Sequence, residues 1–245
     1  MNSESNSGEK PAAQPARVAS KSTETREPAS SELNEDQVLA ILQKADISAD
    51  VLARVARNPG ALKSRKVLQA LVAHPRTPRH ISIPLLRRLF TFDLMQLALT
   101  PALAADIKRA AEEQIVLRSE SLPAGEKISL ARRGPGRIAA QLLEENDARI
   151  VSVALDNGRL VEAGVVTALM GRDASQLLFR LVSEHPKWSQ RIEVQIALLQ
   201  SEKTPLERAI SFATHFSPER LREIVPESRR AELLNFGRPR PEVAE

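Results

Sequence analysis

The chain has 245 residues, a net charge of +4 and a hydrophobic content of 42%, enough for a sizeable core. It lacks cysteine, which excludes disulfides, thiolate metal sites and cysteine nucleophiles, and its single Trp and absent Tyr argue against a pocket or base-stacking platform built from aromatic rings. No apolar run is long enough for a membrane span and the start lacks a signal-peptide core, so we expect a soluble, cytoplasmic protein.

The first 33 residues are rich in Ser, Glu, Pro, Ala, Thr and Lys and contain almost no large aliphatic side chains. Such a segment cannot bury enough apolar surface to offset the entropy of ordering, so residues 1–33 are predicted to be a disordered tail. Order is expected to begin at Asn34, which can cap a helix with help from Gln37. At the other end, residues 237–245 contain two prolines and are expected to fray.

Short amphipathic helices are predicted one after another through residues 34–236, with no strand. Ser48 and Ser64 are expected to cap the second and third helices. Pro84 is expected in the first turn of a helix, because an interior proline would remove a backbone hydrogen bond. The longest helix is predicted from Pro101 to about Arg118.

A hydroxyl residue followed by proline recurs along the chain. At a helix start, the hydroxyl would cap the helix and the proline would occupy the first helical position. The four occurrences are Thr77-Pro78, Thr100-Pro101, Thr204-Pro205 and Ser217-Pro218.

The stretch 128–170 carries two one-sided apolar stripes. One consists of Ile150, Val153 and Ala154, and the other of Val161, Val165 and Leu169. Asp147 stands where a side-chain oxygen can cap the first of these two helices. Helices of about ten residues are marginal alone in water, so we expect them to be held by stacking on their neighbours.

The turns recur with a loose period. Tracked by their first residue they fall at Pro75, Pro101, Pro135, Asn157, Pro186 and Phe216, about 28 residues apart on average. One hairpin of two short helices fits each interval. The predicted fold is therefore all-α, an irregular α-solenoid of stacked short helical hairpins.

Five short motifs extend this interpretation to a family. They are VARNPGA (55–61), LVAHPRTP (71–78), LALTP (97–101), VALDNGRLVEAGV (153–165) and VSEHPKW (182–188). In these motifs the sequence resembles the HEAT-like α-solenoids, and more closely the leucine-rich repeat variant type. The resemblance implies a curved array that serves as a binding scaffold. Such variant repeats have been associated with a cysteine-ligated iron–sulfur cluster, which a chain without cysteine does not carry over, and no catalytic residues transfer.

The positive charge is concentrated in residues 51–92, which hold nine Lys and Arg residues and no acid. A basic surface there would attract phosphates or an acidic protein; the alternative is a solvated face whose arginines pair with acids such as Asp50 or Asp93. The turn 132–137 is a second basic candidate, either an anion loop or an ordinary basic helix end. The candidate surface for an anion or partner comprises Lys63, Arg65, Lys66, Arg76, Arg79, Arg87, Arg88, Arg132, Arg133 and Arg137.

Trp188 follows His185-Pro186 in a predicted turn. It is interpreted either as an exposed hot spot for a partner or as a side chain that closes the gap between two repeats.

No residues stand out as catalytic, cofactor-binding or metal-binding. His74 and His185 precede prolines at predicted helix ends, where an imidazole can interact with unpaired carbonyls. His215 and Glu219 have helical spacing, but a predicted helix start separates them. We therefore expect a non-enzymatic scaffold without a cofactor that binds another protein, with nucleic-acid binding through the basic N-terminal repeats as the alternative.

Overall fold

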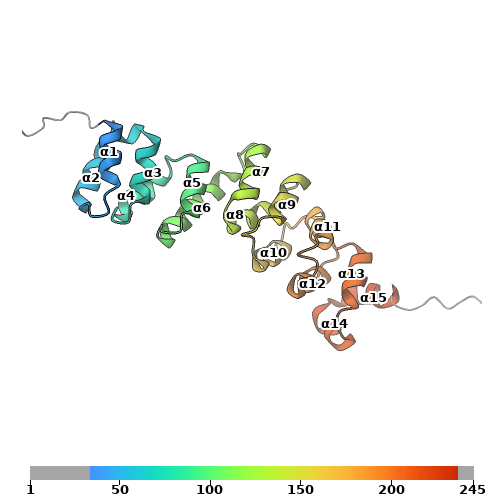
Figure 1. Cartoon of the computed structure of the whole chain (residues 1–245). Coiled ribbons are helices and arrows are strands. Elements are labelled where there is room, and N and C mark those ends of the chain that lie inside the picture. The colour runs from blue at the N-terminus through green and yellow to red at the C-terminus, as the bar shows by residue number, and fades with distance from the viewer. Residues whose placement is uncertain (1–33, 237–245) are drawn as a thin grey trace, which may run out of the picture. The chain divides into compact units, whose positions relative to one another are not determined.

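The structure is a computed structural model that describes residues 34–236. Within that range it contains fifteen short α-helices, two 3₁₀ turns and no strand (Figure 1). The predictions for residues 1–33 and 237–245 lie outside the described residues.

The helices are α1 (Glu35–Leu42), α2 (Ala49–Arg57), α3 (Arg65–Ala73), α4 (Arg79–Leu86), α5 (Thr91–Leu99), α6 (Ala105–Ser119), α7 (Ala124–Arg133), α8 (Gly136–Gln141), α9 (Ala148–Leu155), α10 (Glu162–Leu169), α11 (Gln176–Glu184), α12 (Ile192–Leu199), α13 (Leu206–Ala213), α14 (Pro218–Ile224) and α15 (Glu227–Phe236). The 3₁₀ turns are η1 (Ala61–Lys63) and η2 (Leu142–Glu144).

The helices alternate between two layers (Figure 1). In layer A, formed by the odd-numbered helices, α3 contacts α1 and α5, and α9 contacts α7 and α11. In layer B, formed by the even-numbered helices, α6, α8, α10 and α12 contact one another in sequence. Each helix thus packs mostly on helices one or two places away in the chain. This confirms the prediction of an all-α solenoid of stacked hairpins.

Hydrogen bonds between hairpins repeat at nearly constant sequence separation. In each, a side chain donates to a backbone carbonyl at a helix end or turn 25 to 33 residues earlier. The pairs are His74 with Lys44, Arg88 with Leu62, Arg118 with Leu89, Asn157 with Ala131, Trp188 with Leu155, Lys203 with Ala174, and Arg229 with Thr204. Ala131 and Leu155 lie in the last turns of α7 and α9, where a carbonyl has no partner within its helix, and the other acceptors lie in turns between α-helices.

Several predicted helix caps are present. Oγ of Ser48 accepts from the backbone N–H of Val51 at 3.4 Å, and Oγ of Ser64 accepts from Val67 at 3.3 Å. Asp147 Oδ1 accepts from the amide of Arg149 at 2.9 Å. Hydrogen bonds from the side chain and the backbone of Arg149 lower the pKa of the Asp147 carboxyl to about 2. These caps fix where α2, α3 and α9 begin.

The predicted helix start, with a hydroxyl cap followed by proline, is wrong at three of its four positions. It holds only at Ser217, whose Oγ accepts from the amide of Arg220, with Pro218 as the first residue of α14. Thr77 and Thr204 instead donate to the carbonyls of Leu71 and Leu198, each at 2.6 Å. Their hydroxyls therefore close the end of the preceding helix.

Two proline predictions also need correction. The helix expected from Pro101 begins at Ala105, because Thr100 caps the end of α5 and the intervening residues form a turn. It is nevertheless the longest helix in the described part of the chain. Pro84 lies inside α4 rather than in its first turn.

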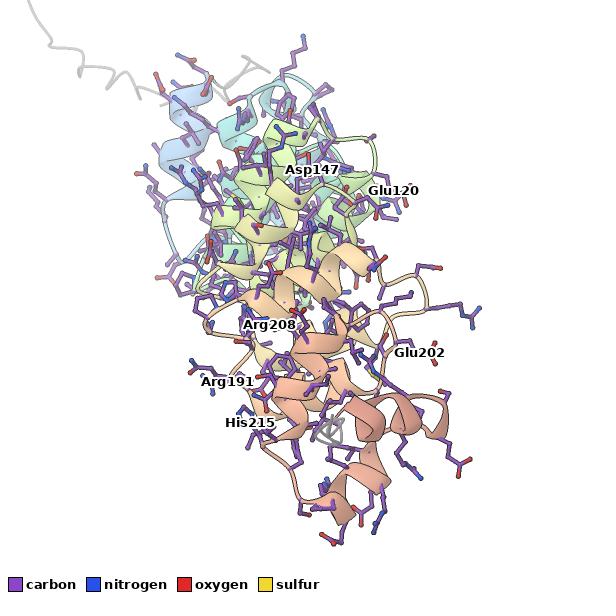
Figure 2. The ribbon with its side chains drawn as sticks, turned by 90° about the vertical axis from the view of Figure 1, so that its right-hand side faces the viewer. Glu120, Asp147, Arg191, Glu202, Arg208 and His215 are labelled. Carbon is purple, nitrogen blue, oxygen red and sulfur yellow. The ribbon has the colours of Figure 1, made fainter. Side chains whose placement is uncertain are left out.

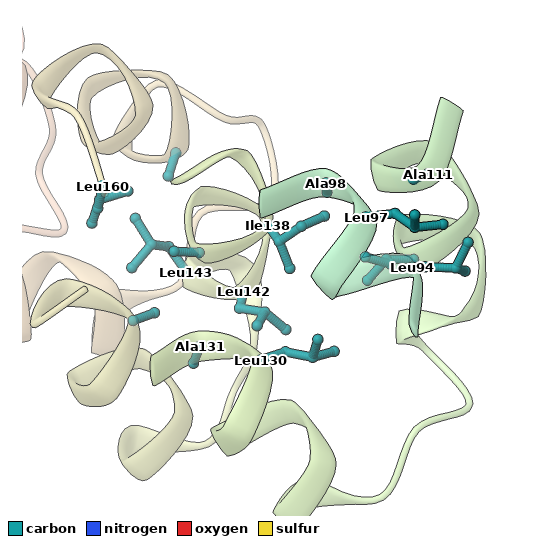
Figure 3. Packing of buried hydrophobic residues seen from close by; sticks show 14 of the residues in the cluster. Leu94, Leu97, Ala98, Ala111, Leu130, Ala131, Ile138, Leu142, Leu143 and Leu160 are labelled. Atoms are coloured by element: carbon teal, nitrogen blue, oxygen red, sulfur yellow. The ribbon is translucent and has the colours of Figure 1, made fainter. Parts of the chain in front are cut away.

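The apolar core runs through both layers as one cluster, part of which Figure 3 shows. Ile107, Ala111 and Ile115 of α6 are fully buried, as their spacing predicts. In α9 the predicted stripe is displaced by part of a turn. Val151 is 0% exposed, whereas Val153 is only half-buried. A helix packed on two neighbours buries more of its circumference than one stripe.

A charge placed in α9 tests this assignment. Val151→Asp should destabilise the protein by at least ~3 kcal/mol, because the carboxylate would be buried without a partner. Val153→Asp, at a half-buried position, should cost about 1 kcal/mol or less. Thermal unfolding followed by circular dichroism measures both. Equal losses in melting temperature would contradict the assigned faces of the helix.

Candidate functional site

A groove of about 380 Å³ lies on layer B between α8 and α10. Its lining consists of Gly136, Arg137, Ala140, Gln141, Glu144, Val161, Ala163, Gly164, Thr167 and Ala168. Most of these side chains are small or aliphatic. A groove of this kind suits an apolar anchor side chain with a few polar contacts around it.

Small residues bring the two helices close together. A Cβ at Gly164 would lie 3.0 Å from the Cβ of Ala140, and a Cβ at Gly136 would lie 2.0 Å from the carbonyl oxygen of Arg159. The turn before α10 therefore rests directly on the start of α8. This contact leaves no room for larger side chains, and the resulting depression is open to solvent.

Charged and polar side chains border the groove. Arg137 Nη1 lies 3.7 Å from Glu112 Oε2 and 4.0 Å from Glu113 Oε1, both on α6. Gln141 Nε2 donates to Glu144 Oε2 at 2.7 Å. Burial raises the pKa of the Glu112 carboxyl, and Arg137 opposes that rise. The pair is long, so Arg137 keeps hydrogen-bonding capacity for a ligand.

Most of the exposed large apolar side chains belong to layer B, spread over four of its helices. Among the described residues there are six, and five lie on layer B helices or at their ends: Ile83, Leu117, Val161, Met170 and Ile192. The sixth, Phe90, lies under the guanidinium of Arg65 at 5.2 Å. Val161 was predicted to be core, but it is 61% exposed because it precedes the first turn of α10.

The ten predicted basic residues do not form one stripe. Lys63, Arg65, Lys66, Arg87 and Arg88 lie at turns that lead from layer B to layer A, which we call the B-to-A edge. Arg76, Arg79, Arg132, Arg133 and Arg137 lie at or beside turns that lead from layer A to layer B, the A-to-B edge. The two groups therefore belong to different edges of the stack.

Half of the ten have partners inside the fold. Arg65 pairs with Asp93 at 2.6 Å, Arg76 with Asp46 at 3.3 Å, and Arg79 with Asp106 at 2.5 Å. Arg88 donates to the carbonyl of Leu62, and Arg137 approaches Glu112 and Glu113 as described above. No acid of residues 34–236 forms an ion pair with the remaining five, which are Lys63, Lys66, Arg87, Arg132 and Arg133.

Trp188 packs between hairpins. It is 2% exposed, and its Nε1–H donates to the carbonyl of Leu155 at 2.8 Å. The ammonium of Lys187 lies 3.9 Å from the ring centroid. The side chain is thus occupied within the fold, as the packing interpretation expects, and does not present its ring to a partner.

The two His-Pro turns share one geometry. Nδ1 of His74 accepts the amide of Arg76, and Nδ1 of His185 accepts the amide of Lys187, each at 3.2 Å. Their Nε2 atoms therefore face the preceding hairpin as donors, His74 to the carbonyl of Lys44 and His185 to Asp156. The predicted contact of the imidazole with a backbone carbonyl is therefore present for His74, whereas His185 contacts a carboxylate instead.

The described residues provide neither a cluster of metal ligands nor a membrane-spanning helix. No group of three or more His, Cys, Asp or Glu side chains in residues 34–236 is arranged to hold a metal ion. No described helix has the length and apolarity to cross a bilayer.

The groove escaped the sequence analysis, although a signal for it exists. Gly136 and Ala140 are four residues apart on α8, and Gly164 and Ala168 are four residues apart on α10. Small residues at that spacing form a flat strip along one face of a helix. Two such strips one repeat apart predict two helices in close contact.

Glycine substitutions distinguish close packing from free surface. Gly136→Ala should destabilise the protein by about 1–3 kcal/mol, because its Cβ would collide with the backbone of Arg159. Gly125→Ala is the matched control, since nothing lies within 4 Å of that Cβ. It should stabilise α7 by roughly 0.5–1 kcal/mol. Chemical denaturation measures both, and a neutral Gly136→Ala would contradict the close contact.

The single tryptophan reports on the interface of α9 and α11. In the folded protein its emission should be blue-shifted relative to the unfolded chain and resistant to quenching by iodide, because the ring is buried. Emission and quenching like those of the unfolded chain would contradict this packing.

Comparison with known proteins supplies no function. No protein-family model, no curated protein and no solved structure matches the chain significantly. What the chain does is therefore argued from its own residues.

Proposed function

We propose that the chain is a non-enzymatic helical-repeat protein that binds another protein through layer B. The observation that carries this proposal is the groove between α8 and α10, on the same layer as five exposed aliphatic side chains. Exposed apolar surface beside a groove is typical of an interaction site, and Val161 is the one of these five side chains that lines the groove.

The polar surroundings fit a protein partner. An interface typically has an apolar centre and a polar rim. Here Ala140, Gly164 and Ala168 line the groove, and Arg137, Gln141 and Glu144 border it. The scarcity of aromatic rings limits what the groove can hold by stacking, so an aliphatic anchor is the better match.

The repeat type belongs to the same proposal. We propose HEAT-like repeats, closest to the leucine-rich repeat variant type. Two layers of short helices and hydrogen bonds between hairpins at separations of 25 to 33 residues support this assignment.

Binding of nucleic acid or another polyanion is the second candidate. It is favoured by Lys63, Lys66 and Arg87, which lie at the B-to-A edge without an ion pair to any described acid. It is weakened by Asp93, Asp106 and Asp46, which neutralise three neighbouring arginines. The acid-free segment 51–92 is thus less basic in the fold than in the sequence.

A matched pair of alanines tests the groove. Ala163 lines it in the first turn of α10, and Ala148 is an exposed alanine in the first turn of α9 on layer A. We expect Ala163→Arg to weaken binding of peptides selected from a displayed random library by at least about tenfold, because the new side chain fills the groove. Ala148→Arg should leave their binding unchanged.

Two results would contradict the proposed function. One is a library that yields no peptide dependent on the folded chain, and the other is equal binding by both variants. A third arm of the experiment measures the binding of labelled single- and double-stranded nucleic acid to the chain at increasing salt concentration. Tight binding there with a steep salt dependence, lost on replacing Lys63, Lys66 and Arg87 by Ser, would favour the second candidate.

A further inference from the structure

Three consecutive A-to-B turns carry bases, at equivalent positions in the second and third turns and at the preceding helix end in the first. Arg133 ends α7, Arg159 lies between α9 and α10, and Lys187 lies between α11 and α12. They are 26 and 28 residues apart, one repeat each. Arg159 and Lys187 also share their backbone geometry. The backbone N–H of each donates a hydrogen bond to the side chain two residues earlier, which is Asn157 or His185.

Specific contacts place these turns next to one another. Asn157 Nδ2 donates to the carbonyls of Ala131 and Gly134 at 2.7 and 3.2 Å, which joins the second turn to the first. Trp188 donates to Leu155 and His185 contacts Asp156 at 3.2 Å, which joins the third turn to the second. The bases therefore follow one another along one edge.

The bases of this row have no acidic partner. Arg132 and Arg191 extend it within the same turns, and all five side chains are exposed. No described acid forms an ion pair with any of them. The nearest acids in the sequence are Asp156, Glu162, Glu184 and Glu193. Asp156 contacts His185, while Glu162 and Glu193 lie in first turns, where helix dipoles favour them.

The opposite edge of the same hairpins has the opposite balance of charge. Its turns carry Glu144, Glu145, Asp147, Asp173 and Glu202 against Arg172 and Lys203, and of these acids Glu145 pairs with Lys127 and Asp147 with Arg149. Figure 2 shows Arg191 on one side of the ribbon and Glu202 and Glu120 on the other. Bases are thus in excess at one edge and acids at the other, which would orient an approaching charged partner.

Apolar surface accompanies the bases. Val161 is two residues after Arg159, and Ile192 is adjacent to Arg191; both are exposed. Val161 and Gly136 also line the groove between α8 and α10, which therefore reaches this edge. A nucleic-acid backbone would use the bases but would leave the aliphatic side chains without a partner. A peptide with both acidic and apolar residues would use both.

The repeat spacing specifies the peptide further. Packed helices lie about 8–10 Å apart, so equivalent turns of successive hairpins present a base at about that interval. A polyproline II helix has three residues per turn and rises about 3.1 Å per residue, so every third side chain points the same way at about 9 Å intervals. An extended β-strand would alternate those side chains between faces.

From this match we propose that the A-to-B edge from α7 to α12 binds an acidic peptide segment in polyproline II conformation. Acids at every third position meet Arg133, Arg159 and Lys187, and an apolar side chain between them enters the groove at Val161. This inference rests on the proposed function, because it names the class of protein segment that the same surface takes.

The test uses a fluorescently labelled peptide with four repeats of Glu-Pro-Leu, measured by fluorescence anisotropy with the full chain. We expect binding that weakens with salt. We expect Arg159→Ser with Lys187→Ser to weaken it by at least about tenfold. The matched control is Arg172→Ser with Lys66→Ser, which removes the same charge from the opposite edge and should have little effect.

A second peptide has the same composition with its four Glu residues in one block. It should bind several-fold more weakly, because only one or two of its acids can reach bases. Circular dichroism verifies the fold of each variant. If the Arg159→Ser, Lys187→Ser protein does not fold, Arg132→Ser with Arg133→Ser provides the same test.

Three results would overturn the inference: no binding of the repeat peptide, equal affinity for the block peptide, or equal loss in the control variant. If library peptides still bind in a manner that depends on Ala163 but not on Arg159 and Lys187, the proposed function stands and only the acidic class of partner is wrong. If no library peptide binds either, both fail. Tighter binding of single-stranded nucleic acid at Arg159 and Lys187 would assign this edge to a different partner.

Discussion

The fold depends on hydrogen bonds that join each hairpin to the one before it. A helix of eight or nine residues has almost as many unpaired terminal carbonyls as internal hydrogen bonds, so its ends are costly to bury. Asn157 and Trp188 reach back about one repeat and satisfy such carbonyls, while Lys203 donates to the carbonyl of Ala174 in the turn before α11. The same contacts set the register of the stack, since a hairpin shifted by one residue would lose its donors. Burial of apolar side chains drives the stacking of the hairpins, and these hydrogen bonds determine the register in which the hairpins stack.

The helices and their order were largely predictable because the signals that fix them are local. Ser48, Ser64 and Asp147 act through groups two or three residues away, so their roles can be read from the sequence. Thr77 and Thr204 have the same chemistry, but their hydroxyls turn to the helix behind them. The acceptor that each hydroxyl bonds depends on how the next hairpin packs, and no local sequence pattern contains that information. The predicted burial of Val153 and Val161 was wrong for a related reason, since the exposure of these side chains depends on which neighbours cover α9 and α10.

The site was less predictable than the fold. A run of bases without acids in residues 51–92 looks like one surface, yet Asp93 and Asp106 come from the next hairpin to neutralise Arg65 and Arg79. The row through Arg133, Arg159 and Lys187 is inconspicuous in the sequence because about a repeat separates its members. In a stacked fold, surface charge is organised across repeats rather than along the chain. Charge counted along the sequence therefore overstates one region and misses another.

The nearly constant reach of the inter-hairpin bonds also affects how such a chain can change in length. Within residues 34–236 each donor reaches back one repeat, and no contact of this kind spans two hairpins. Loss or duplication of one whole hairpin would keep each donor about one repeat from a preceding turn, and the shared geometry of the turns at His74 and His185 shows that turns one or more repeats apart can be alike. Insertion of part of a hairpin would instead move the donor that follows it out of reach of the carbonyl that precedes it. Chains built this way should tolerate changes of length in units of about 28 residues far better than smaller ones.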